Sequence, residues 1–389
     1  GVENEYVFII VDESVGLNTS FERSKQLMRI LHIITNLQTG GAEKLMVDLL
    51  PRLRDFNNDV ELLLFDGSHT PFYYWLEKEG IKIHSLGVIK NVYHPIYLFR
   101  LYFFLKKHKF DIVHTHNTAP QLYSAVVSCF YHITLCTTEH STCNRRRAWK
   151  YYTPIDRWMY SRYKEIICIS DAAEANIREH LKKKVQNIYT IYNGVDINKV
   201  TSASTNTDLR EHNKRYVLIM VARYTYQKDQ DTLIRAMALL PKEDYELWLV
   251  GDGERRSILE NLCKELNVDD RVRFLGIRMD VPSLLKAADI VIMSSHLEGL
   301  SLSNIEGMSV GKPFIASDVD GLREVTKNYG ILFPHQDAEA LAKAITELMR
   351  NSELYDSTAA RCKKRALQFD ISVMAKKYND RYCRLLKLK

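Results

Sequence analysis

The amino-acid sequence predicts an α/β protein with two Rossmann-like domains, each built on a parallel β-sheet. Apolar, β-branched runs alternate with segments of helical length along most of the chain, which is typical of βαβ units. The apolar runs are continuous rather than alternating, as expected for strands covered by helices on both faces. A polar stretch at residues 201–208 interrupts the pattern near the middle of the 389 residues, a length that fits two domains.

The expected elements follow this alternation through both halves of the chain. In the first half, we expect strands at 30–34, 60–65, 81–86, 112–114, 133–138, 166–169 and 188–191, with helices at 42–53, 96–108, 121–130 and 172–180. In the second half, we expect strands at 216–221, 246–250, 272–275, 290–293, 313–316 and 331–333, and closing helices at 338–349, 352–369 and 372–387. Two domains joined near residue 200 are the simplest interpretation.

Composition narrows the class of protein. Hydrophobic residues make up 46% of the chain and charged residues 26%, which excludes a disordered, collagenous or disulfide-stapled chain. Apolar runs do not approach 18 residues, so we predict no membrane-spanning helix. The seven cysteines contain no C-x-x-C pair, which disfavours a zinc knuckle and favours buried thiols in a reducing, cytoplasmic compartment.

The first 27 residues differ from the rest. A short apolar run is followed by acidic and polar residues, a pattern that a secretory signal does not have. Met28 stands directly before the first expected strand. We therefore interpret residues 1–27 as a non-native or start-site extension before Met28.

In the first half, polar residues follow expected strands. Gly40 and Gly41 open an expected helix, where backbone N–H groups can hold an anion, although a plain tight turn has the same pattern. His116 is either a ligand-binding or a purely structural histidine. Glu139 and His140 are either a capping loop or the floor of a substrate site, and the nearby cysteines do not complete a zinc site.

The second half offers a stronger constellation. Arg223 and Lys228 lie between an expected strand and helix, where they form either a diphosphate clamp or a solvated pair. Gly251 ends the next strand. Glu298 and Glu306 flank an expected helix start, an arrangement in which N–H groups can hold phosphate and carboxylates can accept bonds from sugar hydroxyls.

In this order and spacing, these residues resemble the retaining glycosyltransferases of family 4, which have the GT-B fold. The resemblance runs from about Met28 to the C-terminus. It rests on Gly40-Gly-Ala-Glu, His114-Thr-His, Asn193-Gly-Val-Asp, Arg223 with Lys228, Gly251-Asp-Gly, and Glu298 with Glu306 before Gly311-Lys-Pro. It implies an acceptor-binding domain at 28–197, a nucleotide-sugar-binding domain at 198–370, and a helix at 371–389 that crosses back to the first domain.

The resemblance also implies roles. Arg223 and Lys228 would neutralise the donor diphosphate in place of a metal, Glu306 would bind the ribose, and Glu298 would touch the transferred sugar. His116 would contact that sugar and, with Glu139 and His140, the acceptor. The implied donor-binding residues are Gly40, Gly41, Arg223, Lys228, Gly251, Glu298, Gly299, Leu300, Ser301, Leu302, Ser303 and Glu306, and the implied catalytic residues are His116, Arg223, Lys228 and Glu298.

Three positions depart from the family pattern. Asp229 and Ser301 stand where the family often has glycine, and Gly307 stands where it often has alanine. Backbone N–H contacts survive these changes, so we still expect an active enzyme of the hexosyltransferase type. The donor would be a UDP- or GDP-sugar and the acceptor a glycan or polyprenyl-linked glycan, in surface polysaccharide, lipopolysaccharide or capsule synthesis. We expect neither a cofactor nor a metal.

The implied mechanism is retention with the leaving phosphate as base, because no enzymic nucleophile is evident. Glu139 is the one carboxylate that we consider as a candidate nucleophile. One rival is a sugar-nucleotide epimerase or hydrolase of the same fold. A second is a nucleotide-binding regulatory protein, against which the complete set of charged site residues argues. A third is a nucleic-acid binder, which no recognised motif supports.

The net charge of +6 is unevenly distributed. Residues 82–164 carry a net charge of +10 and the rest of the chain −4. Within this region, segments 95–109 and 145–152 are both basic and aromatic. They are either core aromatics with a solvated rim, or a surface that docks the first domain peripherally on the inner, anionic face of the cell membrane.

Overall fold

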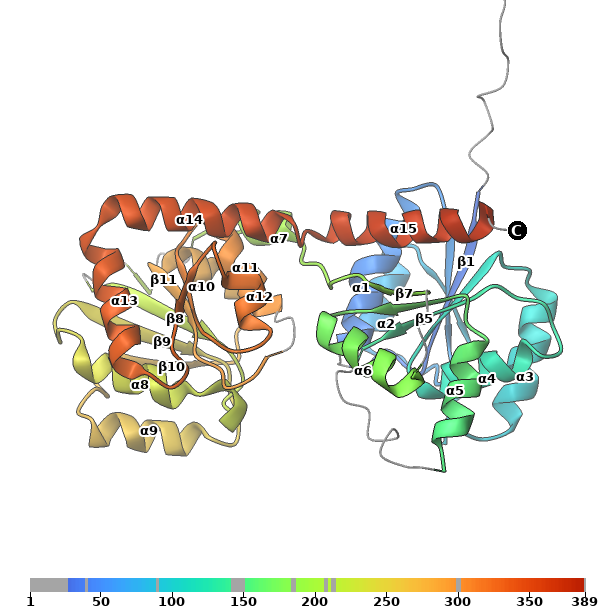
Figure 1. Cartoon of the computed structure of the whole chain (residues 1–389), viewed down its shortest axis with the longest axis horizontal. Coiled ribbons are helices and arrows are strands. Elements are labelled where there is room, and N and C mark those ends of the chain that lie inside the picture. The colour runs from blue at the N-terminus through green and yellow to red at the C-terminus, as the bar shows by residue number, and fades with distance from the viewer. Residues whose placement is uncertain are drawn as a thin grey trace, which may run out of the picture.

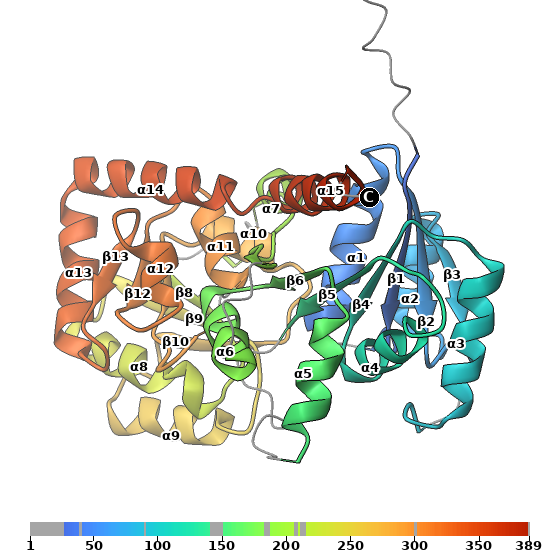
Figure 2. The ribbon, with the colours of Figure 1, turned by 45° about the vertical axis from the view of Figure 1, so that its right-hand side comes forward.

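The computed structural model describes residues 27–38, 41–88, 91–140, 151–182, 187–205, 209–210, 215–298 and 302–387. These residues form two α/β units, each built on one parallel sheet (Figures 1 and 2). The predicted fold class is thereby confirmed. All but the last residue of the predicted N-terminal extension, and all of segment 141–150, lie outside the described residues.

The first unit holds a seven-stranded parallel sheet in the order β3-β2-β1-β4-β5-β6-β7. Its strands are β1 (Arg29–Ile34), β2 (Asp59–Leu64), β3 (Lys82–Ser85), β4 (Ile112–His116), β5 (Leu135–Glu139), β6 (Glu165–Cys168) and β7 (Ile188–Thr190). Its helices are α1 (Gly41–Arg54), α2 (Pro71–Lys78), α3 (Ile96–Lys107), α4 (Thr118–Val127), α5 (Thr153–Ser161) and α6 (Asp171–Leu181).

Both faces of this sheet are buried. Along β1, Ile30 and Ile34 join one apolar cluster with α1, while Leu31 and Ile33 join a second cluster with α3, α4 and α5. This packing explains why the strands read as continuous apolar runs. β4 extends to His116, two residues beyond the predicted end, because its polar side chains are buried by partners from other strands.

The second unit holds a six-stranded parallel sheet in the order β10-β9-β8-β11-β12-β13. Its strands are β8 (Tyr216–Val221), β9 (Tyr245–Val250), β10 (Val272–Gly276), β11 (Ile290–Met293), β12 (Phe314–Ser317) and β13 (Ile331–Phe333). The helical elements are α7 (Ile197–Ser202), η2 (Tyr226–Lys228), α8 (Gln230–Leu239), α9 (Arg256–Glu265), α10 (Val281–Ala287), α11 (Leu302–Ser309), α12 (Leu322–Thr326), α13 (Ala338–Arg350) and α14 (Ser352–Leu367).

The chain passes between the units before α7 and again between α14 and α15 (Ile371–Lys387), and the two crossing segments touch (Figure 1). The N–H of Val195 donates to the carbonyl of Phe369 over 2.9 Å, and the N–H of Ile371 donates to the carbonyl of Val195 over 3.0 Å. A Cβ atom on Gly194 would lie 2.7 Å from the Cα of Ile371, so glycine permits this close approach.

Helix α15 packs on the first unit although it follows the second in sequence (Figure 2). Tyr378 and Tyr382 are fully buried in the cluster that also contains α1 and β1. Arg381 forms an ion pair with Glu165 of β6. Among the described residues, the structure holds no helix with both the length and the apolarity needed to cross a bilayer.

Candidate active site

The loop between β8 and α8 carries the two predicted donor-binding cations. Arg223 is exposed. Lys228 ends η2 and forms an ion pair with the carboxylate of Glu298, which comes from the loop after β11. The hydroxyl group of Ser295 donates to the same carboxylate over 2.7 Å. Two predicted site residues that are 70 positions apart in sequence are thus in direct contact.

Asp229 explains one departure from the family pattern. Its backbone is left-handed, with φ of 48°, a conformation that glycine adopts freely and that Asp tolerates better than most residues. Its carboxylate accepts a hydrogen bond from the N–H of Thr232 at 3.3 Å and from the Thr232 hydroxyl at 2.7 Å, so it caps α8. The aspartate therefore keeps the turn and adds a helix cap.

Gly251 has a positional role next to the same loop. Its φ is 139°, and a Cβ atom there would lie 2.1 Å from the carbonyl oxygen of Ala222. Backbone cannot yield to a methyl group at that distance, so Gly251 lets the end of β9 pack against the residue before Arg223. The structure thus ties this predicted donor-site glycine to the position of the arginine.

Helix α11 presents the second predicted carboxylate. Leu302 and Ser303 form its first turn, and Glu306 follows one turn later, all three half-buried. A Cβ atom on Gly307 would lie 2.7 Å from Cγ1 of Val291, so the replacement of alanine by glycine lets α11 pack closely on β11. Four predicted donor-site residues lie outside the described residues: Gly40, Gly299, Leu300 and Ser301.

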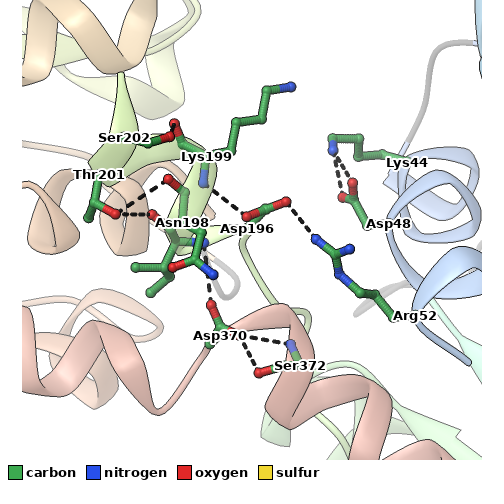
Figure 3. Close-up of polar contacts among 11 residues, drawn as sticks. Lys44, Asp48, Arg52, Asp196, Asn198, Lys199, Thr201, Ser202, Asp370 and Ser372 are labelled. Atoms are coloured by element: carbon green, nitrogen blue, oxygen red, sulfur yellow. Dashed lines mark hydrogen bonds and ion pairs between the residues drawn. The ribbon is translucent and has the colours of Figure 1, made fainter. Parts of the chain in front are cut away.

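Charged side chains of α1 face the start of α7 across the junction of the two units (Figure 3). Lys44 of α1 also interacts electrostatically with Glu306 of α11. Arg52 donates to one oxygen of Asp196 over 2.8 Å, while the other oxygen caps α7 at the N–H of Lys199. Burial raises the pKa of Glu306, and the Lys44 ammonium group opposes that shift. Lys44 lies three residues after Gly41, the exposed first residue of α1, so the predicted glycine loop adjoins the helix that faces Glu306.

His116 is fully buried at the end of β4, and both of its ring nitrogens are in hydrogen bonds. Its Nε2 lies 3.0 Å from Nδ1 of His32 in β1, and its Nδ1 lies 2.9 Å from Nε2 of His140, which follows β5. The structure thus brings together two of the predicted acceptor-side residues. A ring nitrogen of His116 can meet a sugar only if one of these bonds opens.

Two of these rings, those of His32 and His116, form a parallel stack with His114. The centroids of His32 and His114 are 4.9 Å apart and those of His114 and His116 are 4.7 Å apart, with interplanar angles of 8° and 9°. Burial lowers the pKa of His32 to about 3 and that of His140 to about 4. Burial also lowers the pKa of His114 and His116 well below the ordinary value, so the cluster is neutral at pH 7.

Glu139 is buried at the end of β5. Its Oε1 accepts hydrogen bonds from Gln121 Nε2 at 2.8 Å and from the hydroxyl group of Tyr160 at 2.6 Å. Gln121 lies on α4 and Tyr160 on α5, so hydrogen bonds from two helices fix the Glu139 carboxylate. Such a fixed group serves the floor of a site better than it serves as a mobile nucleophile.

Sequence reasoning quoted His114 only as part of a motif and missed His32 and Tyr382, which contact it. His32 and His114 are register partners on neighbouring strands, and the hydroxyl oxygen of Tyr382 lies 2.7 Å from Nδ1 of His114. A histidine inside a continuous apolar strand is the one signal that pointed to a buried partner. Its partners lie 82 and 350 positions away and leave no local pattern.

Within the described part of the chain, one trio of side chains has the spacing of a metal site. Asp229, His296 and His335 each offer a ligand atom, and these atoms lie within 4.8 Å of one another. Nδ1 of His296 also lies 2.8 Å from Nε2 of His335, so a hydrogen bond joins the two imidazoles.

Two parallel-sheet units with charged loops at their strand ends define the GT-B class of glycosyltransferase, and comparison with known proteins agrees. The family model for glycosyltransferase family 4 matches residues 39–199, and that for glycosyl transferases group 1 matches residues 204–368. The chain therefore belongs to glycosyltransferase family 4 and is a glycosyltransferase. The predicted family is confirmed.

Individual relatives and solved structures are similar over most of the chain. UDP-Gal:alpha-D-GlcNAc-diphosphoundecaprenol alpha-1,3-galactosyltransferase of Escherichia coli is 27% identical, over 77% of this chain and 81% of that protein. HepE of Anabaena, solved in complex with UDP, has a TM-score of 0.77 at 22% identity, over 92% of this chain and 100% of that one. A glycosyltransferase from Rickettsia africae has a TM-score of 0.81 at 21% identity, over 93% and 100%.

Proposed function

We propose that the protein is a retaining, metal-independent hexosyltransferase that moves a sugar from a UDP- or GDP-sugar to a glycan or polyprenyl-linked acceptor, in the synthesis of a surface polysaccharide, lipopolysaccharide or capsule. The contact between Lys228 and Glu298, together with exposed Arg223 in the same loop as Lys228, supports this proposal. A cation suited to phosphate is then next to a carboxylate suited to sugar hydroxyls. The E. coli relative, named for a UDP-galactose donor and a diphosphoundecaprenol acceptor, supports the substrate classes.

The chemistry follows from where charge develops. As the bond between C1 of the sugar and the β-phosphate oxygen breaks, negative charge grows on that phosphate. Arg223 offers a planar fork and Lys228 a point charge to stabilise it. The acceptor oxygen attacks C1 on the face that the phosphate leaves, and its proton passes to the departing phosphate oxygen. Retention by this route requires no enzymic nucleophile.

Turnover of the cation variants tests the donor site. Arg223→Ala and Lys228→Ala should each lower kcat by roughly 10²–10³-fold, as when one preorganised donor to a developing charge is lost. Arg235→Ala is the matched control, because Arg235 is an exposed arginine of α8. Activity within a few-fold of wild type in both test variants would refute the diphosphate assignment.

Metal independence has its own test. Turnover in EDTA should equal turnover in added Mg²⁺, because the two cations take the role of a metal. A loss in EDTA that Mg²⁺ or Zn²⁺ restores would instead direct attention to Asp229, His296 and His335, the trio with metal-site spacing.

The rival function is a sugar-nucleotide epimerase or hydrolase of the same fold. Product analysis separates the three activities: a transferase forms a new glycoside only with acceptor present, a hydrolase releases free sugar, and an epimerase returns an isomeric sugar nucleotide. NMR of the product's anomeric proton then tests retention, since an inverted linkage would contradict the same-face mechanism.

Helix α3 supports peripheral docking of the first unit on an anionic membrane. Its buried side carries Tyr97, Leu101 and Leu105, whereas Phe99 and Phe103 are 60% and 63% exposed. The aromatic residues of this segment are thus only partly core. Basic residues follow in the last turn of the helix, and such a combination suits insertion of aromatic rings beside anionic headgroups.

Vesicle sedimentation tests this docking. Wild-type protein should bind vesicles that contain phosphatidylglycerol more tightly than phosphatidylcholine vesicles, and the double variant Phe99→Ser, Phe103→Ser should lose the difference. Ile258→Ser is the matched control, because Ile258 is 49% exposed on α9 of the other unit. Equal sedimentation with both lipids would remove the membrane proposal and leave the transferase proposal intact.

A further inference from the structure

Three strand ends of the second unit bring a carboxylate and two imidazoles together. Asp229 follows β8, His296 follows β11 and His335 follows β13. These strands belong to one parallel sheet, so their carboxyl ends lie at the same edge. We call the three residues the Asp–His–His cluster. Each of them offers a ligand atom within 4.8 Å of those of the other two, although they are up to about a hundred positions apart in the sequence.

The ring nitrogen Nδ1 of His296 lies between the other two residues. It is 2.8 Å from Nε2 of His335 and 3.5 Å from Oδ2 of Asp229. A tetrahedral Zn²⁺ ion with bonds of about 2.0–2.2 Å holds neighbouring ligand atoms roughly 3.4 Å apart. The two distances lie on either side of this separation, so small side-chain movements would bring the atoms to coordination distance.

Hydrogen bonds alone do not account for this arrangement. An imidazole nitrogen either donates one proton or offers one lone pair, and the 2.8 Å contact with His335 already uses Nδ1 of His296. The 3.5 Å contact with Asp229 is too long for a good hydrogen bond. A cation among the three atoms would instead receive a lone pair from each of them and would replace the proton between the imidazoles.

The two inner residues of the cluster are held by their surroundings. The Thr232 hydroxyl donates to Oδ2 of Asp229 over 2.7 Å, and the Ser294 hydroxyl donates to the Asp229 carbonyl over 2.7 Å. The backbone N–H of His296 donates to the carbonyl of Gln227 over 2.8 Å. Hydrogen bonds of this kind orient metal ligands and raise the affinity of a site.

The cluster also has an open side. Asp229 is buried, His296 is half-buried and His335 is exposed, so an ion can enter past His335 and water can complete its coordination. Two imidazole nitrogens and one carboxylate oxygen suit Zn²⁺, whereas Mg²⁺ and Ca²⁺ prefer oxygen ligands alone.

We propose that Asp229, His296 and His335 bind one Zn²⁺ ion that joins the loop after β8 to the loop after β13. The ion is structural: it stabilises the second unit and takes no part in sugar transfer, for which Arg223 and Lys228 supply the positive charge. Zinc binding is measured without any substrate, so this site stands or falls independently of the proposed function.

Zinc titration against a chromophoric chelator tests the site in untagged, EDTA-treated protein. Wild type should bind one Zn²⁺ ion at this site, and His335→Ala should weaken the binding at least about tenfold, the effect of losing one ligand or its support. His132→Ala is the matched control, because His132 is an exposed histidine between α4 and β5. Unchanged affinity in His335→Ala, or an equal loss in His132→Ala, would overturn the proposal.

Cobalt substitution identifies the ligand atoms. Cysteine thiolates are the main alternative ligands of zinc, and they give Co²⁺ a strong charge-transfer band that imidazole and carboxylate do not. The Co²⁺ spectrum of wild type should lack this band, and excess Mg²⁺ should leave Zn²⁺ bound. A thiolate band that persists in His335→Ala, or displacement of Zn²⁺ by Mg²⁺, would contradict the assignment.

Thermal unfolding measures the structural role. With free Zn²⁺ at about one hundred times the dissociation constant, Tm of the second unit should rise by at least about 3 °C, while Tm of the first unit should stay in place. His335→Ala should lose this rise and yet match wild-type turnover in EDTA. No rise in wild type, or lower turnover of His335→Ala in EDTA, would overturn the structural role. Zinc binding as expected in a protein that transfers no sugar would refute only the proposed function.

Discussion

Replacing Arg381 by methionine should loosen α15 from the first unit. The guanidinium group makes a bidentate ion pair with Glu165 of β6, in which Nε lies 2.9 Å from Oε2 and Nη2 contacts Oε1. Its central carbon also lies 3.4 Å from the centroid of the Tyr189 ring. The two charged side chains are only 13% and 4% exposed, so removing the cation leaves a buried carboxylate without its main partner.

The magnitude follows from this burial. Removing one partner of a buried ion pair costs about 3–5 kcal/mol. Methionine keeps the apolar contacts of the arginine stem, so we expect the lower end of the range for Arg381→Met. Adding Glu165→Gln removes the stranded charge, so the double variant should recover about half of the loss, about 1.5 kcal/mol.

Calorimetric unfolding is the appropriate assay, because two-unit proteins seldom unfold in one step. The transition of the first unit should shift down in Arg381→Met while that of the second stays in place. Lys376→Met is the control, since Lys376 and Asp380 form an exposed pair on the same helix, and such pairs contribute about 0–1 kcal/mol. A loss below about 1 kcal/mol in Arg381→Met, or a double variant no more stable than the single one, would refute the reasoning.

Two further predictions concern the donor side. Gly251→Ala would put a Cβ atom within 2.1 Å of the Ala222 carbonyl oxygen, so the backbone before Arg223 must move. The affinity for UDP, measured by calorimetric titration, should fall about tenfold. An unchanged affinity would contradict the positional role of Gly251. Glu306→Gln should raise the free energy of unfolding at pH 7 and weaken donor binding. Burial holds the folded-state pKa of Glu306 above its unfolded value, so ionisation of Glu306 costs stability once the pH exceeds the unfolded pKa. In urea unfolding below that pKa, the variant should be no more stable than wild type.

The strands of both sheets could be predicted from the sequence, because strands that are buried on both faces appear as continuous apolar runs. Strands such as β8 and β11 lie where the apolar runs predicted them. The polar residues after His114 were misleading in the same terms: β4 continues through Thr115 to His116, whose ring has a partner on β1, just as the ring of His114 has one on α15. A local pattern cannot contain a partner that is hundreds of positions away.

The site residues divide in a similar way. Arg223 and Lys228 could be selected as candidates from the sequence because they lie between a strand and a helix, β8 and α8. The contact of Lys228 with Glu298 needed the structure, as did the finding that Gly251 shapes the loop rather than merely approaching a ligand. The spacing of the motifs predicted which loops contribute candidate residues, whereas the contacts of those residues could be read only from the structure.

Helix α15 gives the order of the chain a physical consequence. The last helix follows the second unit, yet it buries Tyr378 and Tyr382 in the first unit and forms an ion pair with Glu165 there. The first unit therefore lacks part of its core, and Glu165 lacks its ion pair with Arg381, until the end of the chain has folded. The Tyr382 hydroxyl also makes hydrogen bonds with His32 of β1 and His114 of β4. The crossing helix thus completes both the apolar core and a buried polar cluster of the first unit.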